Sequence, residues 1–136
     1  MTKTLSEPRA SQALAQRAAE AASRKHAEDL LILDVRQLSS VTDYFVIGTV
    51  ASHRQMAATV EHIEEEFERV GRSVGHAEGL EEFSSSRRHP APEDDAAWVL
   101  VDCGDVVLLL FNPAARRLYQ LERLCADAPR LSFDAQ

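Results

Sequence analysis

Two aspartates flank a short turn near the end of the chain, and their carboxylates are suited to recognition chemistry. Asp102 and Asp105 are separated by Cys103 and Gly104, and an apolar run lies on each side of this segment. An Asp at a turn commonly hydrogen-bonds its own backbone. A pair of such carboxylates can also grip an Arg or Lys of a partner through charge-assisted hydrogen bonds. The spacing alone leaves both interpretations open.

A polar cluster follows the second of these apolar runs. Three leucines at three-residue spacing are predicted to form the buried stripe of a short helical segment: Leu118, Leu121 and Leu124. The polar residues between them must then project elsewhere, together with the arginine at the start of the segment: Arg116, Tyr119, Glu122 and Arg123. Tyr and Arg are favoured anchors at protein interfaces, so partner contact is favoured over an exposed internal pair formed by Glu122.

Two aromatic residues stand at the start of predicted strands. Trp98, the only tryptophan, is expected at the core or its edge. An indole whose N–H remains in contact with water also suits an interface. Tyr44 follows Asp43 at a strand entrance, where it could bury its ring with the hydroxyl outward. Surface contact with a partner is the second interpretation for both aromatic residues.

Helices and short apolar strands alternate along the chain, which predicts an α/β fold with helices packed on a sheet. The predicted strands cover residues 30–35, 44–50, 73–77, 97–102 and 106–111. The predicted helices cover residues 6–27, about 53–70 and 116–124. Ser52 and Gln55 have the spacing of a capping box before the second helix, and Gly71 is a suitable cap after it. Pro113, which follows Asn112, suits the start of the last helical segment.

The apolar residues of the two longer helices recur at helical spacing and are predicted to face the sheet. In the first helix these are Leu14, Ala18, Ala21 and Ala22. In the second helix they are Met56, Val60, Ile63, Phe67 and Val70, with Glu61, Glu64, Glu65 and Glu68 toward water. The direction of each strand cannot be decided from the sequence.

The composition limits the partners and the chemistry. The chain has 136 residues and a formal net charge of −7, which disfavours direct binding to nucleic acid and favours a basic protein. No apolar run reaches the ~20 residues of a membrane span, and a cytoplasmic protein is expected. The two cysteines are expected to be reduced thiols. Among the five histidines only His62, with Glu66, has a partner at helical spacing, and two ligands do not make a metal site.

Several separated motifs, in the same order, resemble those of the Iojap family, the ribosomal silencing factors. They are the segment 98–111 with 117–124, the run Asp43-Tyr44-Phe45-Val46-Ile47, and Ser52-x-Arg54-Gln55. The resemblance extends from about Ala27 to about Leu131. It implies a mixed sheet of about five strands with packed helices, similar to the nucleotidyltransferase fold. One domain over residues 1–136 is expected, with residues 1–5 flexible and residues 80–96 as an inserted loop.

The resemblance also implies a function. Family members dock on ribosomal protein fourteen of the large ribosomal subunit and block joining of the small subunit, which represses translation without catalysis. No cofactor and no metal are expected, and a homodimer is possible. Two alternatives remain, a nucleotidyltransferase-like enzyme and a dimeric adaptor with another protein target. The chain lacks the Asp-x-Asp pair and the Gly-Ser dipeptide that such an enzyme would use.

The chain departs from the family pattern at four places. Cys103, Leu109 and Cys125 replace residues that are usual in the family, and Val50-Ala51 stands where a Gly often precedes the capping-box helix. The change at Cys125 removes a Trp, so either the affinity for the partner is lower or the apolar contact near the end of the chain is made by Leu124, Leu131 or Phe133.

Overall fold

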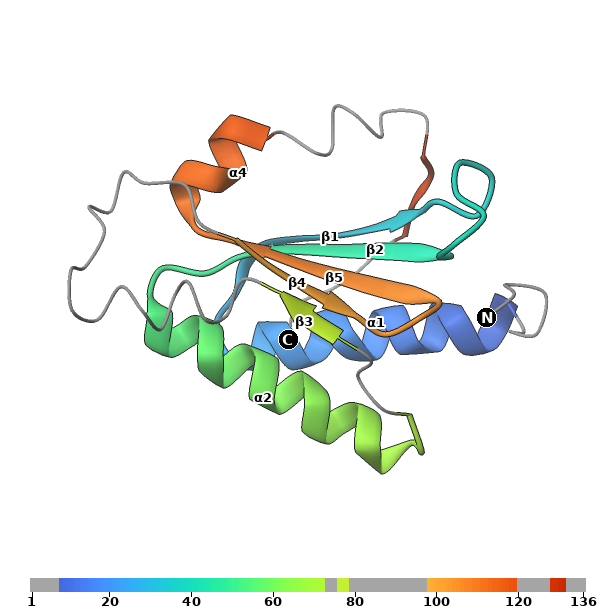
Figure 1. The fold of residues 1–136 in the computed structure, drawn as a ribbon, viewed down its shortest axis with the longest axis horizontal. Helices are drawn as coiled ribbons and strands as arrows, with labels where there is room; N and C mark the ends of the chain where they lie inside the picture. Colours follow the sequence, from blue (N-terminus) through green and yellow to red (C-terminus); the bar gives the residue numbers. More distant parts are fainter. Residues whose placement is uncertain (1–7, 73–75, 79–97, 120–127, 132–136) are drawn as a thin grey trace.

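The computed structural model describes residues 8–72, 76–78, 98–119 and 128–131 (Figure 1). Along the chain these form α1 (Pro8–Arg24), β1 (Glu28–Asp34), β2 (Tyr44–Thr49), α2 (His53–Arg69), β3 (His76–Glu78), β4 (Trp98–Asp102), β5 (Val106–Phe111), α4 (Pro113–Tyr119) and β6 (Arg130–Leu131). The predicted flexible start at residues 1–5, the predicted loop at 80–96, and Glu122 and Arg123 lie outside the described residues.

The strands form one sheet in the order β3-β4-β5-β2-β1-β6. Only β2 and β5 pair in parallel, and every other neighbouring pair is antiparallel. The expected mixed sheet with packed helices is therefore confirmed, and it has six strands because the two-residue β6 adds an edge to the five expected ones. The connection between β1 and β2 is a loop, since these strands pair directly with each other.

The two long helices cover one face of the sheet, and α4 lies on the other face (Figure 1). The predicted stripe of α1 is confirmed, because all four of its residues are buried in the larger of two hydrophobic clusters: Leu14, Ala18, Ala21 and Ala22. The small alanine side chains let α1 lie close to the strands beneath it. From α2, Met56, Val60, Ile63 and Phe67 enter the same cluster.

Local signals set the ends of α2. Ser52 Oγ accepts the backbone N–H of Gln55 at 3.1 Å, as the predicted N-cap requires. Gln55 Oε1 accepts from the N–H of Ala51 at 2.6 Å, one residue earlier than in a regular capping box. At the other end Gly71 has φ +77° and donates its N–H to the carbonyl of Glu68. Val70, the C-cap, is 43% exposed, so its predicted burial is wrong.

The predicted hairpin near the end of the chain is also present. β4 and β5 are antiparallel, and Gly104 supplies the positive φ (87°) of the connection. Asn112 Oδ1 accepts the backbone N–H of Ala115 at 2.8 Å and so caps the start of α4. Leu118 is 66% exposed, so its predicted place in a buried stripe is wrong. The seven residues of α4 make only two turns, and few of their side chains can reach the sheet.

Neither α1, α2 nor α4, the helices of the described residues, has the length and hydrophobicity that a membrane span requires.

Candidate functional site

Among the described residues, α4 and Ala128 cover only part of the sheet face that lies opposite α1 and α2. Side chains alternate between the two faces of a strand, so every second residue of β2, β4 and β5 points away from α1 and α2. We call the surface formed by Phe45, Trp98, Leu100 and Val107 the open sheet face. The strand register places these residues together, because Phe45 pairs with Val107 across the parallel strands and β4 lies on the other side of β5.

The open sheet face is apolar and half-buried. Phe45, Leu100 and Val107 pack against the smaller hydrophobic cluster, which also holds Ile47, Leu109, Phe111 and Ala115. Ala115 is the residue through which α4 joins that cluster, so the helix covers one part of the face and leaves these three side chains partly in contact with solvent. Apolar side chains that remain partly exposed beside one another commonly mark an interaction site.

Trp98 stands at one end of the open sheet face. Its side chain is 36% exposed, and its ring lies against Phe111 with the ring centroids 6.5 Å apart and tilted by 56°. The expectation of core or core edge therefore holds only for the edge. An indole that is anchored by one aromatic neighbour and still open to solvent suits an interface anchor.

Asp102 lies on the same face and is half-buried. Its Oδ1 accepts the backbone N–H of Gly104 at 2.9 Å, which confirms the turn interpretation for this aspartate. This bond uses one carboxylate oxygen, and the side chain remains close to Val107, its partner across the two strands. Asp102 therefore adds a negative group to the border of the open sheet face.

Unlike Asp102, Asp105 is enclosed in the interior of the folded chain, so its predicted contact with a partner is wrong. The residue is 3% exposed and lies in the interior on the side of the two long helices. Ser11 Oγ is 2.8 Å from Oδ2 of Asp105 and also 2.8 Å from Oδ2 of Asp43, and Arg72 makes a close ion pair with Oδ1 of Asp105. These intramolecular partners satisfy a carboxylate that water cannot reach.

The same group of residues joins four parts of the fold. Ser11 comes from α1, Asp43 from the loop before β2, Asp105 from the turn before β5, and Arg72 from the chain after α2. The backbone N–H groups of Asp43 and Tyr44 both donate to the carbonyl of Asp105, at 2.9 and 3.2 Å. We call Ser11, Asp43, Arg72 and Asp105 the buried polar network.

Tyr44 is fully buried, and its predicted outward hydroxyl and surface role are wrong. Among the described residues its hydroxyl has no hydrogen-bond partner. Burial raises the pKa of this phenol above its usual value. Arg36 lies over the ring at 5.6 Å from the centroid and is held by Asp34 through two hydrogen bonds of 2.9 and 2.7 Å. The tyrosine therefore stabilises the entrance of β2.

The remaining predicted residues belong to α4 and the chain after it. Arg116 is half-buried, and its guanidinium donates to Oγ1 of Thr49 at 2.9 Å and to the carbonyl of Asp29 at 2.8 Å. It therefore links α4 to the ends of β1 and β2. Tyr119 is the last residue of α4, and its side chain lies outside the described part of the structure, as Glu122 and Arg123 do. Their predicted contact with a partner stays a prediction.

Three residues of the open sheet face were not predicted: Phe45, Leu100 and Val107. In β5 every residue from Val106 to Phe111 is apolar, so no alternation marks the face that the helices leave uncovered. The only usable signal was the shortness of the last helical segment, which is too small to cover a sheet.

Cys103 is a poor candidate for a catalytic nucleophile. The thiol is buried, and burial raises its pKa to about 12, so it is protonated at neutral pH. Among the described residues no three His, Cys, Asp or Glu side chains are grouped in a way that could hold a metal ion.

Comparisons with known proteins agree with one another. The family model described as "Ribosomal silencing factor during starvation" matches residues 8–136. The ribosomal silencing factor RsfS of Bacillus subtilis is 38% identical over 117 residues, which cover 86% of this chain and 88% of the relative. A mouse protein named mitochondrial assembly of ribosomal large subunit protein 1 is 30% identical over 101 residues, 74% of this chain and 40% of its own length. A crystal structure of a Chromobacterium violaceum protein superposes with a TM-score of 0.72 at 28% identity and covers 92% of both chains.

Proposed function

The chain belongs to the family of ribosomal silencing factors, and on this basis we propose that it binds the large ribosomal subunit and sterically blocks joining of the small subunit. Family membership supports the broader role of a ribosome-associated regulator of translation rather than an enzyme. The large subunit is supported by the name of the mouse relative, which refers to assembly of that subunit.

The single observation that carries the proposal is the open sheet face. Phe45, Leu100 and Val107 form a half-buried apolar surface, and the exposed indole of Trp98 stands at its end. An aromatic anchor beside partly buried aliphatic residues has the composition of an interface centre. A standard interface of ~800 Å² per partner would extend from this face over α4.

The proposed partner on the large subunit is its ribosomal protein fourteen. A net charge of −7 opposes contact with ribosomal RNA and favours a basic protein surface. Asp102, at the border of the open sheet face, could meet an Arg or Lys of that protein with its free carboxylate oxygen. Tyr119, Glu122 and Arg123 are proposed to continue the contact beyond α4.

The proposed mechanism makes and breaks no covalent bond. A bound protein of this size occupies space that the small subunit needs, so the fraction of blocked subunits follows from concentration and affinity alone. Nanomolar binding, about 12 kcal/mol, would be sufficient.

Subunit joining measured by sucrose-gradient sedimentation tests this proposal. Purified small and large subunits are mixed with increasing amounts of the protein, and we expect joined ribosomes to convert to free subunits. Trp98→Ala removes the proposed anchor and should weaken the effect at least about tenfold, since truncation of an interface hot spot costs about 2 kcal/mol or more. Glu64→Gln is the matched control, because Glu64 is exposed on α2, on the other side of the sheet.

Two results would contradict the proposal. If joined ribosomes persist when the large subunit is saturated with the protein, steric blocking is wrong. If Trp98→Ala and Glu64→Gln block joining equally well while both variants remain folded, docking does not use the open sheet face.

The enzymatic alternative has one observation in its favour. The structure brings Asp43 and Asp105 to a common hydroxyl, as a nucleotidyltransferase would bring two acids to metal ions. Ser11 and Arg72 already bind these carboxylates, and Arg72 neutralises the charge of Asp105. Both aspartates are 3% exposed, which leaves little access for a metal ion. Nucleotide turnover with magnesium would revive this alternative, whereas the proposed resemblance to the nucleotidyltransferase fold is tested by superposition on such an enzyme.

A homodimer, or an adaptor for another protein, is the second alternative. The strands at the two sheet edges, β3 and β6, have three and two residues, and such short edges offer little backbone for pairing with a second copy. A dimer would therefore use the open sheet face and compete with the ribosome for it. Light scattering over a dilution series measures this equilibrium.

A further inference from the structure

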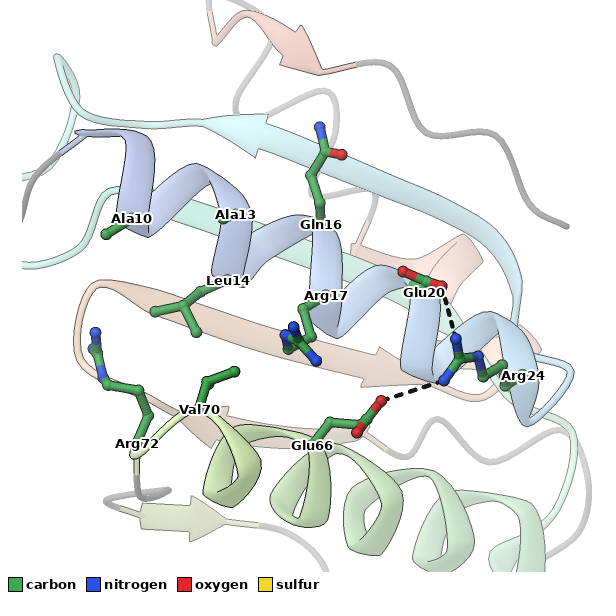
Figure 2. A pocket seen from close by; sticks show the side chains of 10 residues that line it. All are labelled: Ala10, Ala13, Leu14, Gln16, Arg17, Glu20, Arg24, Glu66, Val70 and Arg72. Atoms are coloured by element: carbon green, nitrogen blue, oxygen red, sulfur yellow. Dashed lines mark hydrogen bonds and ion pairs between the residues drawn. The ribbon is translucent and has the colours of Figure 1, made fainter.

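A groove of about 670 Å³ runs between α1 and the end of α2 (Figure 2). It lies on the side of the sheet that carries the two long helices, so it is separate from the open sheet face. Its size falls within the range of small-molecule sites, roughly 300–1,000 Å³. Three arginines line it, together with two glutamates.

Two of these arginines have anionic partners within the protein. Arg24 donates to Glu20 at 2.8 Å and to the buried Glu66 at 3.2 Å. Glu66 is 5% exposed and also pairs with Arg69 at 3.2 Å, so it belongs to the protein interior and not to a solvated helix face. At the other end of the groove Arg72 is held by Asp105. Both guanidinium groups are fixed in place and neutralised.

Arg17 is different. It lies between these two ends, and its side chain is directed into the groove (Figure 2). The residue is half-buried, and within the described part of the chain its guanidinium has no hydrogen bond and no ion pair. A partly desolvated cation without a counter-charge costs free energy, and an anion that enters the groove would recover it.

Apolar side chains lie beside the unpaired guanidinium. Leu14 of α1 and Val70 after α2 line the groove next to Arg17, and Val70 is 43% exposed there (Figure 2). A ligand that fits this arrangement has one anionic group for Arg17 and a flat or apolar body for Leu14 and Val70. A guanidinium binds the oxygens of a phosphate or of a carboxylate through two parallel hydrogen bonds, and the volume of the groove has room for a phosphate carried on a nucleotide-sized body.

We propose that this groove binds a small phosphorylated molecule of nucleotide size, with its phosphate on Arg17 and its apolar body on Leu14 and Val70. The site is independent of ribosome docking, because the two surfaces lie on opposite sides of the sheet. Inorganic phosphate would contact Arg17 but leave Leu14 and Val70 without a ligand group to pack against.

The test uses the ¹⁵N-labelled full chain and adenosine monophosphate as the probe, with adenosine and inorganic phosphate as separate probes. In two-dimensional amide NMR spectra we expect the monophosphate to shift resonances of α1 and of residues 70–72, and both fragments to bind at least about tenfold more weakly. Arg17→Gln should weaken binding of the monophosphate at least about tenfold, the effect of losing a charge-assisted pair of hydrogen bonds.

Arg117→Gln is the matched control. Arg117 is exposed on α4, on the other face of the sheet, and its replacement removes the same charge. Its affinity for the monophosphate should stay within about twofold of the parent chain, as for an unrelated surface substitution. Because no described residue pairs with the guanidinium of Arg17, Arg17→Gln should not lower the unfolding temperature of the parent chain.

The proposal is overturned if adenosine monophosphate shifts no resonance of the groove, or if the two glutamine variants bind it equally. It is also overturned if inorganic phosphate binds as tightly as the monophosphate, since the apolar part of the site would then have no role. Binding of hexaglutamate in the groove without binding of the monophosphate would assign the surface to an acidic protein instead.

Discussion

At the scale of single residues, burial separates side chains that look alike in the sequence. Asp102 and Asp105 lie three positions apart, yet one borders a surface and the other is enclosed with Ser11 and Arg72. The hydroxyl of Ser11 carries one proton and stands 2.8 Å from two carboxylates, so it donates to one of them at a time. Arg72 supplies the charge that lets such acidic groups remain together in the interior.

Replacing Ser11 with Ala tests the importance of the buried polar network. The change removes the only hydroxyl between the two buried aspartates, and we expect a loss of about 1–3 kcal/mol in the free energy of unfolding. Urea unfolding followed by circular dichroism measures it. Ser23→Ala, on the same helix and half-buried, is the control and should change stability by less than about 0.5 kcal/mol. Equal stability of the two variants would show that the hydroxyl contributes nothing.

At the scale of elements, local hydrogen bonds set the ends of the helices, and tertiary contacts decide which parts of the helices and strands remain exposed. α2 begins at the Ser52 cap and ends before Gly71, where sequence patterns placed both boundaries. The short α4 also begins at its predicted signal, Asn112 followed by Pro113, but it is too small to cover the sheet. Within the described residues, the seven-residue α4 therefore leaves the open sheet face partly exposed.

Gly71→Ala tests the cap of α2. Gly71 has φ +77°, and a Cβ there would meet no atom within 4 Å, so the cost comes from the backbone conformation alone. We expect a loss of about 1–2 kcal/mol in the free energy of unfolding, the strain of an L-residue in the left-handed region. Gly71→Asn should recover part of this loss, because Asn tolerates that region better. Thermal unfolding of both variants compares them, and a larger loss for Asn than for Ala would contradict the explanation.

At the scale of the whole molecule, the two sides of the sheet have different surfaces. The side with α1 and α2 carries the exposed glutamates of α2 and the arginine-lined groove, while the other side presents the open sheet face. A negative protein with an apolar docking face would avoid RNA phosphates and still bind a basic protein among them. Shape and charge would then act together to select the partner.

The salt dependence of binding to large subunits tests this arrangement. We expect the affinity to fall by less than about tenfold between about 50 and about 200 mM salt, whereas proteins that make several phosphate contacts lose about 10³–10⁵ over that range. Co-sedimentation at a series of salt concentrations provides the measurement. A loss of the larger size would mean that the protein binds RNA, despite its net charge of −7.

The sequence by itself determined the helices, five of the six strands, the caps of α2 and α4, and the family. It also placed Trp98 and Asp102 near a candidate surface. These follow from periodicity and short-range spacing, which act over a few residues. Only the tertiary structure decided that Tyr44 and Asp105 are interior and that Phe45, Leu100 and Val107 remain partly exposed. Burial depends on contacts between distant segments, such as Ser11 with Asp105, 94 positions apart. β5 has apolar side chains on both faces, so its sequence does not indicate which face is covered. The helices that pack on the sheet determine which face remains open.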